Sequence, residues 1–293
     1  MYNIRTDLAI ESQEGMRKNQ ESIPGVRCFE QSLEEDACVT TVYIDTENAA
    51  RFLNRPKGVY VTYENRKLPD MEKEEQIARQ IAKIIRRMLK QDLDLSKGID
   101  KSVLIIGLGN KGVTADALGP EVIENLFITR HLIKEYGPFA ISTEKVGRIS
   151  GIAPGVMAQT GMESKEIIKG LVEQIHPDYV ITVDALAARN GKRLGKTIQF
   201  TDTGITPGSG VGNHRVSINE SSIGKKVLSI GVPTVIDAAT LVFDTLMESK
   251  EAGYRRMDPK LQEMFVTPKD IDESNRCMSK LISQGINIAF LGE

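Results

Sequence analysis

The chain has 293 residues, of which 40% are hydrophobic and 27% are charged, as is usual for a globular protein. This composition argues against a disordered or fibrous chain. The formal net charge of −2 shows no overall bias toward nucleic acid. No apolar run approaches the length that spans a bilayer, so membrane insertion is not expected.

The cysteines and the N-terminus indicate the compartment. Cys28, Cys38 and Cys277 form neither a metal-type spacing nor an even-numbered disulfide framework, which indicates a reducing compartment. The first 15 residues lack the charged region and apolar core of a signal peptide. The sequence therefore predicts a soluble cytoplasmic protein.

The first hundred residues predict two strands and one long helix. Residues 1–38 are polar and without a clear period, apart from a turn at Pro24 and Gly25. Alternating, β-branched segments at 38–44 and 58–63 predict strands. Residues 71–92 predict an amphipathic helix, whose apolar face is Ile77, Ile81, Ile84, Ile85, Met88 and Leu89. Its basic face is either solvated or binds an acidic partner, and consists of Arg79, Lys83, Arg86, Arg87 and Lys90.

The stretch 103–120, VLIIGLGNKGVTADALGP, has the pattern of a buried strand followed by a loop and a helix. The apolar run 103–106 meets glycines, and Pro120 suits the first turn of a helix. The loop between them carries one acid, Asp116. Because ligands bind outside the carboxyl ends of strands in open α/β sheets, Asp116 is a candidate site residue. The alternative is a solvated loop acid.

Beyond this crossover, strand and helix patterns alternate. Strands are predicted at 140–146, 179–183, 197–200 and 227–230, and helices at 165–175, 238–247 and from 268 onward. This rhythm predicts an α/β fold with a mainly parallel sheet covered by helices on both faces, and the first hundred residues then form an N-terminal strand and helix extension.

A second acid, Asp184, directly follows the predicted strand 179–183. If that strand neighbours 103–106, the carboxyl groups of Asp116 and Asp184 converge. Two close carboxyls share a proton, and such a pair can deprotonate a water while hydrogen-bonding a carbonyl. Asp184 is otherwise a salt-bridged acid or a helix cap.

Other motifs are weaker. Residues 107–112 match G-x-G-x-x-G, but the helix that should hold a pyrophosphate begins only after six further residues. The tripeptide 202–204 matches that of pepsin-like proteases, which need two such lobes, and 207–210 lacks the first glycine of a G-x-S-x-G elbow. None of His131, His176 and His214 lies in a zinc-type motif. The long glycine-rich loop 202–212 is expected to be functional.

Five segments, at 106–120, 151–164, 183–189, 202–215 and 230–238, together resemble the germination protease family of spore-forming bacteria. The resemblance implies an endopeptidase that degrades small acid-soluble spore proteins in the cytoplasm of the forespore or spore core. It implies an atypical aspartic peptidase with Asp116 and Asp184 as its acids, an α/β fold like that of hydrogenase-maturation proteases, and a homotetramer. Direct contact with nucleic acid or membrane is not expected.

The resemblance also bears on metals. In the hydrogenase-maturation relatives, an acid at the place of Asp116 helps to bind nickel. The peptidase family implies no metal and no cofactor, so none is assigned. The role of His214, where the family pattern has lysine, stays open, as does which acid is the base. The alternative function is a metal-chaperone or nucleotide-binding module without peptidase activity.

The resemblance finally implies a self-processing zymogen. Residues 6–11, Thr-Asp-Leu-Ala-Ile-Glu, match the context in which family substrates are cut after an acid. The match places the scissile bond between Asp7 and Leu8, with a propeptide at 1–7 and one peptidase domain at 8–293, divided into the extension (8–98) and a core (99–293). The alternative is a plain solvated tail.

Overall fold

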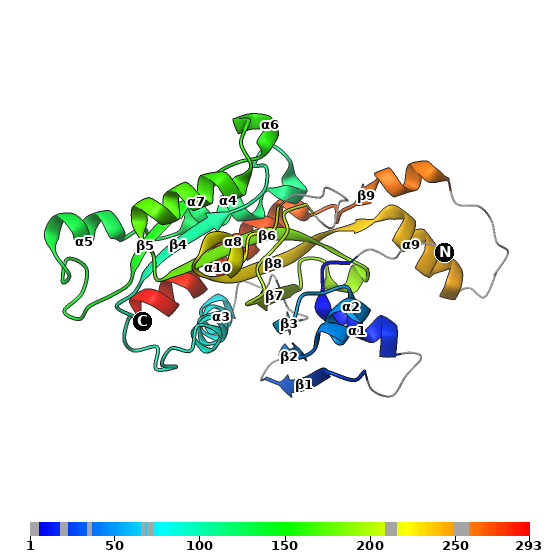
Figure 1. Cartoon of the computed structure of the whole chain (residues 1–293), viewed down its shortest axis with the longest axis horizontal. Coiled ribbons are helices and arrows are strands. Elements are labelled where there is room, and N and C mark those ends of the chain that lie inside the picture. Colours follow the sequence, from blue (N-terminus) through cyan, green and yellow to red (C-terminus); the bar gives the residue numbers. More distant parts are fainter. Residues whose placement is uncertain are drawn as a thin grey trace.

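The computed structural model describes residues 6–17, 23–33, 37–65, 68, 73–208, 216–248 and 258–293 (Figure 1). This part of the chain forms a nine-stranded sheet in the order β1-β2-β3-β7-β8-β6-β4-β5, with β9 paired to β8. The strands are β1 (Val26–Ser32), β2 (Ala37–Ile44), β3 (Gly58–Asn65), β4 (Ser102–Gly107), β5 (Arg148–Ile152), β6 (Tyr179–Ala188), β7 (Thr197–Thr201), β8 (Lys226–Asp237) and β9 (Phe265–Val266). The α-helices are α1 (Ala9–Arg17), α2 (Glu47–Leu53), α3 (Glu74–Met88), α4 (Leu118–Asn125), α5 (Arg130–Tyr136), α6 (Met157–Thr160), α7 (Ser164–Ile175), α8 (Glu220–Ile223), α9 (Ala238–Glu248) and α10 (Ile271–Leu291). Short 3₁₀ turns are η2 (Thr114–Asp116), η3 (Gly191–Arg193) and η5 (Pro259–Glu263).

The sheet is mixed. Strands β5, β4, β6 and β8 run parallel to one another, whereas β1, β2, β3 and β7 pair antiparallel and join the parallel part through β8. The predicted α/β fold is therefore confirmed, but the sheet is mixed rather than mainly parallel, with its parallel strands in one half. The residues of the predicted N-terminal extension supply β1, β2 and β3 of the antiparallel part, and β3 pairs directly with β7, which comes from the predicted core.

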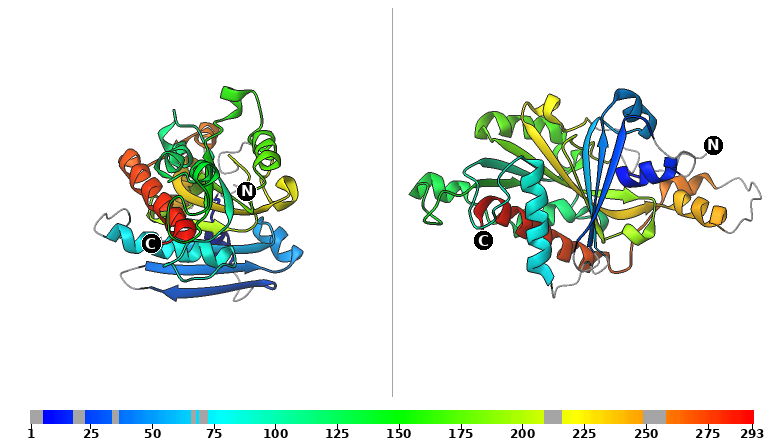
Figure 2. Two further views of the ribbon diagram at one scale, coloured as in Figure 1. Left: turned by 90° about the vertical axis from the view of Figure 1, so that its left-hand side faces the viewer. Right: turned by 90° about the horizontal axis from the view of Figure 1, so that it is seen from below.

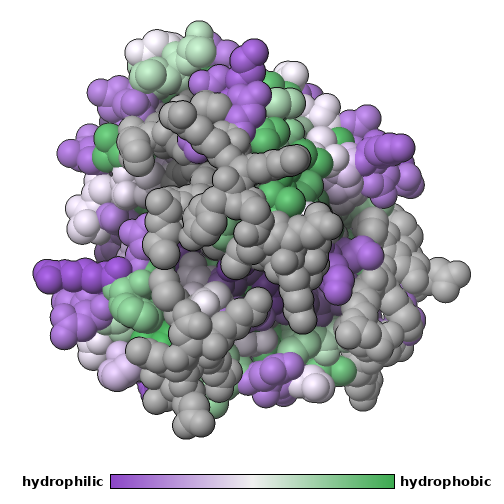
Figure 3. Space-filling view, turned by 90° about the vertical axis from the view of Figure 1, so that its right-hand side faces the viewer, coloured by the Kyte–Doolittle hydropathy of each residue, from purple (hydrophilic) through white to green (hydrophobic). Residues whose placement is uncertain are grey.

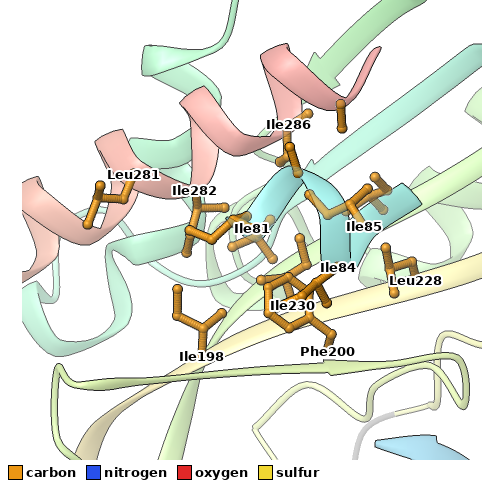
Figure 4. Close-up of a cluster of buried hydrophobic side chains, with 14 of the residues drawn as sticks. Ile81, Ile84, Ile85, Ile198, Phe200, Leu228, Ile230, Leu281, Ile282 and Ile286 are labelled. Carbon is orange, nitrogen blue, oxygen red and sulfur yellow. The ribbon is translucent and has the colours of Figure 1, made fainter. Parts of the chain in front are cut away.

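Helices cover both faces of the sheet because successive residues of a strand point to opposite sides. Val103 and Ile105 of β4 pack with α3, α4 and α10, whereas Leu104 and Ile106 pack with α7 and α8. Figure 2 shows α3 and α10 crossing on the first of these faces. Figure 4 shows the side chains that join these two helices to β7 and β8, which are Ile81, Ile84, Ile85, Leu281, Ile282, Ile286, Ile198, Phe200, Leu228 and Ile230.

The prediction of a strand at 140–146 is wrong. These residues form no strand, and most of them are exposed or half-buried. The edge strand is β5 instead, which pairs parallel with β4 from Ser102 opposite Arg148 onward. Its sequence, Arg-Ile-Ser-Gly-Ile, has little strand propensity of its own, so the pairing with β4 decides the strand's position.

The basic face of α3 was expected either to be solvated or to bind an acidic partner, and Arg86 does neither. Its side chain is only 1% exposed, and its guanidinium donates to the main-chain carbonyls of Ala289 at 2.9 Å, Asp92 at 3.3 Å, Asp94 and Lys97. Burial lowers the pKa of Arg86 from its ordinary value. Arg86 thus ties the end of α3 and the following loop to the end of α10.

Candidate active site

The two predicted acids lie at one edge of the sheet because β4 and β6 are neighbouring parallel strands. Gly107 pairs with Val183, and the Leu108 N–H donates to the Val183 carbonyl at 2.8 Å. Asp184 comes next, within β6, which continues to Ala188 rather than ending at Val183 as predicted. The loop that leaves β4 leads to η2 and Asp116.

The loop that carries Asp116 is held by hydrogen bonds at both of its ends. The Asp116 carboxylate accepts from the Asn110 N–H at 2.7 Å, so the side chain closes its own loop. From the other side, the Asn275 amide of α10 donates to the Thr114 carbonyl at 2.6 Å. These contacts fix the turn relative to the core.

A β-bulge in β8 provides a third anchor. Leu186 and Ala187 of β6 are adjacent, but their partners on β8 are Pro233 and Val235, so Thr234 is an extra residue. The Thr234 hydroxyl donates to the Ala115 carbonyl at 2.7 Å, next to Asp116. Bulges often redirect a side chain in this way beside functional sites.

Gly119 should be indispensable for this arrangement. A Cβ at Gly119 would lie 2.2 Å from the Leu108 carbonyl oxygen and 2.7 Å from that of Val183. These are main-chain atoms of the strand ends and cannot rotate away. We expect Gly119→Ala to lower the free energy of unfolding by at least about 2 kcal/mol and the melting temperature by roughly 4 °C or more.

The matched control for this substitution is Gly170→Ala. Gly170 lies inside α7, and a Cβ there would meet nothing within 4 Å. Alanine is the better helix former, so this variant should gain about 0.5–1 kcal/mol of stability. Thermal melts of both variants check the pair, and equal melting temperatures would contradict the close approach at Gly119.

Asp116, Asp184 and Asp7 line a single pocket of about 300 Å³. Asp184 is only 5% exposed, and Asp116 is half-buried. The apolar part of the wall comes from Val113, Val156, Leu186, Ile205, Val235 and Phe265. Figure 3 looks onto the end of the molecule that carries α9, where hydrophilic and hydrophobic surfaces mix. The acids are thus gathered in a largely apolar pocket.

Asp7 reaches this pocket by binding to the end of β6. Its N–H donates to the Ala187 carbonyl at 2.8 Å, and its carboxylate accepts from the Ala187 N–H at 2.8 Å. The side-chain amide of Gln199 donates to the Asp7 carbonyl at 3.1 Å. Both the main chain and the side chain of Asp7 are therefore held in place.

The residues after Asp7 are equally well packed. Leu8 is fully buried, in a cluster with Leu186 and Ile236. The Glu11 carboxylate accepts from the main-chain N–H groups of Arg189 at 2.7 Å and Asn190 at 2.9 Å. The alternative of a plain solvated tail is therefore wrong for residues 6–15, whereas residues 1–5 lie outside the described part of the chain.

Arg193 fastens α1 to the sheet. Its guanidinium contacts Glu11 at 3.4 Å, Glu14 at 2.8 Å and Glu64 of β3 at 2.8 Å. Burial lowers the pKa of Arg193, but the hydrogen bonds from its guanidinium to Glu14 and Glu64 outweigh this, so the pKa lies above its usual range. The segment that follows Leu8 is thus part of the folded domain.

The glycine-rich loop also reaches the pocket. Its residues 205–208 line the wall beside the acids, whereas Asp202 accepts from the Val59 N–H at 2.8 Å and so joins the end of β7 to β3. His214 lies outside the described residues. Sequence reasoning missed Gln199, because no motif marks this residue and only the fold brings it to Asp7.

Two further observations concern metals and membranes. Among the described residues, no three histidine, cysteine or acidic side chains are grouped so that they could hold a metal ion. Within the same ranges, no helix has the length and apolar character needed to cross a bilayer.

Comparisons with known proteins identify the family. The family model described as germination protease matches residues 4–249. The chain is 42% identical to a germination protease of Clostridium perfringens, over 99% of this chain and 95% of that one. It is 41% identical to one of Caldanaerobacter subterraneus, over 99% and 94%, and 42% identical to one of Bacillus subtilis, over 84% and 66%.

Among solved structures, a [NiFe] hydrogenase maturation protease, HycI of Thermococcus kodakarensis, matches with 20% identity and a TM-score of 0.33, covering 64% of this chain and 93% of that one. The family resemblance predicted from the motifs is confirmed by the matching family model and by relatives that align over nearly the full length. The chain belongs to the germination protease family and is a peptidase.

Proposed function

We propose that this peptidase is of the aspartic type and degrades small acid-soluble spore proteins during germination, with Asp116 and Asp184 activating the attacking water. The observation that carries the proposal is that Asp184 of β6 and Asp116, in the turn that follows the neighbouring parallel strand β4, line one pocket. Small acid-soluble spore proteins are the substrates that the family resemblance implies. The spore core as location and a homotetramer as assembly belong to the same proposal.

The chemistry follows from the pocket. The proposed chemistry requires that the two carboxyl groups share one proton, as two close carboxyls do in an apolar site where their negative charges would repel each other. The ionised carboxyl can take a proton from a water molecule, and the protonated one can donate to the peptide group. This pair hydrolyses a peptide bond without a nucleophilic side chain, metal or cofactor.

The chain is also proposed to be a zymogen that cleaves itself between Asp7 and Leu8, so that residues 1–7 are a propeptide and 8–293 the peptidase domain, with its extension at 8–98 and core at 99–293. Two observations support cleavage of the Asp7–Leu8 bond. Asp7 lines the pocket of the acids. The Ala187 N–H donates to the Asp7 carboxylate, as it would to the acidic side chain of a bound substrate.

The test is the N-terminus of the purified full-length protein. Mild acidification favours the state in which one of the two carboxyls is protonated, so incubation there should convert the N-terminus to Leu8 by mass spectrometry. Asp116→Asn protein should keep its original N-terminus, and wild type should still convert in excess chelator. An unchanged wild-type N-terminus, or equal conversion in the variant, would contradict the proposal.

A further inference from the structure

Gln199 of β7 makes two hydrogen bonds with residues 7–9, and the function proposed above gives these bonds no role. The side chain is only 6% exposed. Its Oε1 accepts from the Ala9 N–H at 2.7 Å, and its Nε2 donates to the Asp7 carbonyl oxygen at 3.1 Å. Only one orientation of the amide satisfies both bonds, because an N–H must meet Oε1 and a carbonyl must meet Nε2. The amide is therefore fixed across the Asp7–Leu8 bond.

We propose that Gln199 is a catalytic residue of this peptidase, which polarises the carbonyl group of the scissile bond and stabilises the oxyanion that forms there. The inference rests on the proposed self-cleavage between Asp7 and Leu8. The proposal adds a hydrogen-bond donor to the two acids. The Nε2 group of Gln199 would serve as the donor that forms the oxyanion hole in other hydrolases.

The position of Asp7 between two pockets supports this assignment. Asp7 lines the pocket of Asp116 and Asp184, and it also lines an adjoining pocket of about 420 Å³ that contains Gln199. Leu186, Ile205 and Thr206 are common to both pockets. Asp7 thus lines both the pocket of the acids and the pocket that contains Gln199, whose amide binds the Asp7 carbonyl oxygen.

The chemistry balances with the groups present and one water. The water oxygen bonds to the Asp7 carbonyl carbon, while one water proton passes to the ionised carboxyl of the acid pair. The carbonyl electrons move to oxygen, and the resulting charge is stabilised by the Gln199 N–H. When the C=O re-forms, the bond to Leu8 nitrogen breaks, and that nitrogen takes a proton from the acid pair. The products are the Asp7 carboxyl and the Leu8 amine.

The buried, doubly bonded amide suits this role. A donor that is already in place costs no reorganisation when charge develops, and its hydrogen bond is stronger where water is excluded. The bond from the Ala9 N–H holds Oε1, so Nε2 stays directed at Asp7. Removal of one such donor reduces the rate of comparable hydrolases by about 10²–10³-fold.

The test measures the first-order rate at which full-length protein acquires Leu8 as its N-terminus, by intact mass over time. Gln199→Ala should lower this rate by about 10²–10³-fold. Gln80→Ala is the matched control, since Gln80 of α3 accepts from the Tyr63 hydroxyl at 2.7 Å and does not line the pockets of Asp7. Its rate should equal that of wild type.

Gln199→Glu distinguishes a catalytic from a merely structural role. This variant keeps the size and an acceptor for Ala9 but loses the N–H donor at neutral pH. On acidification the substituted carboxyl gains a proton and can again donate, so the ratio of variant to wild-type rate should rise as the pH falls. The titratable and charged groups of the same pocket are Asp7, Arg55 and Tyr60, and burial raises the pKa of Tyr60, so it stays neutral in this range.

The outcomes separate the two proposals. If wild type does not cleave at Asp7–Leu8, the proposed self-processing fails and the role of Gln199 with it. If wild type cleaves and Gln199→Ala cleaves within about twofold of it, only the role of Gln199 is overturned. A rate ratio for Gln199→Glu that does not change with pH, in protein whose melting temperature matches wild type, also overturns it.

Discussion

Replacement of either Asp116 or Asp184 by asparagine is expected to slow peptide cleavage by about 10²–10⁴-fold without unfolding the protein. Asparagine has the size of aspartate but carries no titratable proton, so the pair loses either its base or its acid. Both side chains keep their main-chain bond, because an amide oxygen can still accept from the Asn110 N–H beside Asp116 or the Ala185 N–H beside Asp184. The measurements are the rate of self-processing and the cleavage of a synthetic peptide with residues 2–14 of this chain.

Asp178→Asn is the matched control for these two variants. The Asp178 carboxylate also accepts from a main-chain N–H, that of Ser102 at 2.7 Å, but it lies at the opposite end of β4 and β6. This variant should cleave at the wild-type rate. If Asp116→Asn or Asp184→Asn retained activity within about tenfold of wild type, the acid pair would not be the source of catalysis.

Replacement of Arg86 by methionine is expected to cause the largest loss of stability, about 3–5 kcal/mol, and to lower the melting temperature by roughly 10 °C. Methionine fills the space of the apolar stem but cannot donate to any of the four carbonyls that the guanidinium binds. The carbonyl of Ala289 at the end of α10, whose bond to Arg86 is buried, and the part-buried carbonyls of Asp92, Asp94 and Lys97 would lose their partner. Thermal and urea melts measure the effect.

Arg87→Met provides the comparison, because Arg87 is the next residue of the same helix and is exposed. It should change the free energy of unfolding by less than about 0.5 kcal/mol. Arg86→Lys should recover only part of the loss, since one ammonium cannot reach the carbonyls that the guanidinium fork bridges. Equal melting temperatures for Arg86→Met and Arg87→Met would contradict the inference that Arg86 ties α3 and the following loop to the end of α10.

Elements with a strong side-chain period were predictable from the chain alone. The helix α3 and the strands β2, β3, β4 and β6 lie where the apolar pattern placed them, within a few residues at their ends. Such patterns record which face of an element is buried, and this information is local. The helix α1 and the edge strands β1 and β5 lack such an apolar pattern, because their positions depend on pairing and packing with distant segments.

The side chain of Arg86 illustrates the same limit within a correctly predicted helix. Its spacing assigns it to the basic face with Arg87, yet it is buried and Arg87 is exposed. The difference arises because α10 and the loop 92–97 lie over that part of α3 and present carbonyls to it. No local pattern encodes a partner that comes from the other end of the chain.

The two acids of the candidate site could be predicted from the sequence itself. Asp116 and Asp184 each follow a buried strand pattern, and the carboxyl ends of neighbouring parallel strands lie at the same edge of a sheet. The motif at residues 6–11 likewise predicted cleavage between Asp7 and Leu8 through the family resemblance. What the chain alone left open was whether this N-terminal segment reaches the acids.

The tertiary structure decided that point. Asp7 lies in the pocket of the acids because the end of β6 binds its main chain and its carboxylate, and Gln199 meets the same segment although it is 190 residues away from Ala9. Gln199 faces Asp7 because of the antiparallel register of β7 with its neighbours, in which a slip of one residue would turn the side chain to the other face of the sheet. That register is set by contacts between strands, so only the folded chain brings Gln199 to the Asp7–Leu8 bond.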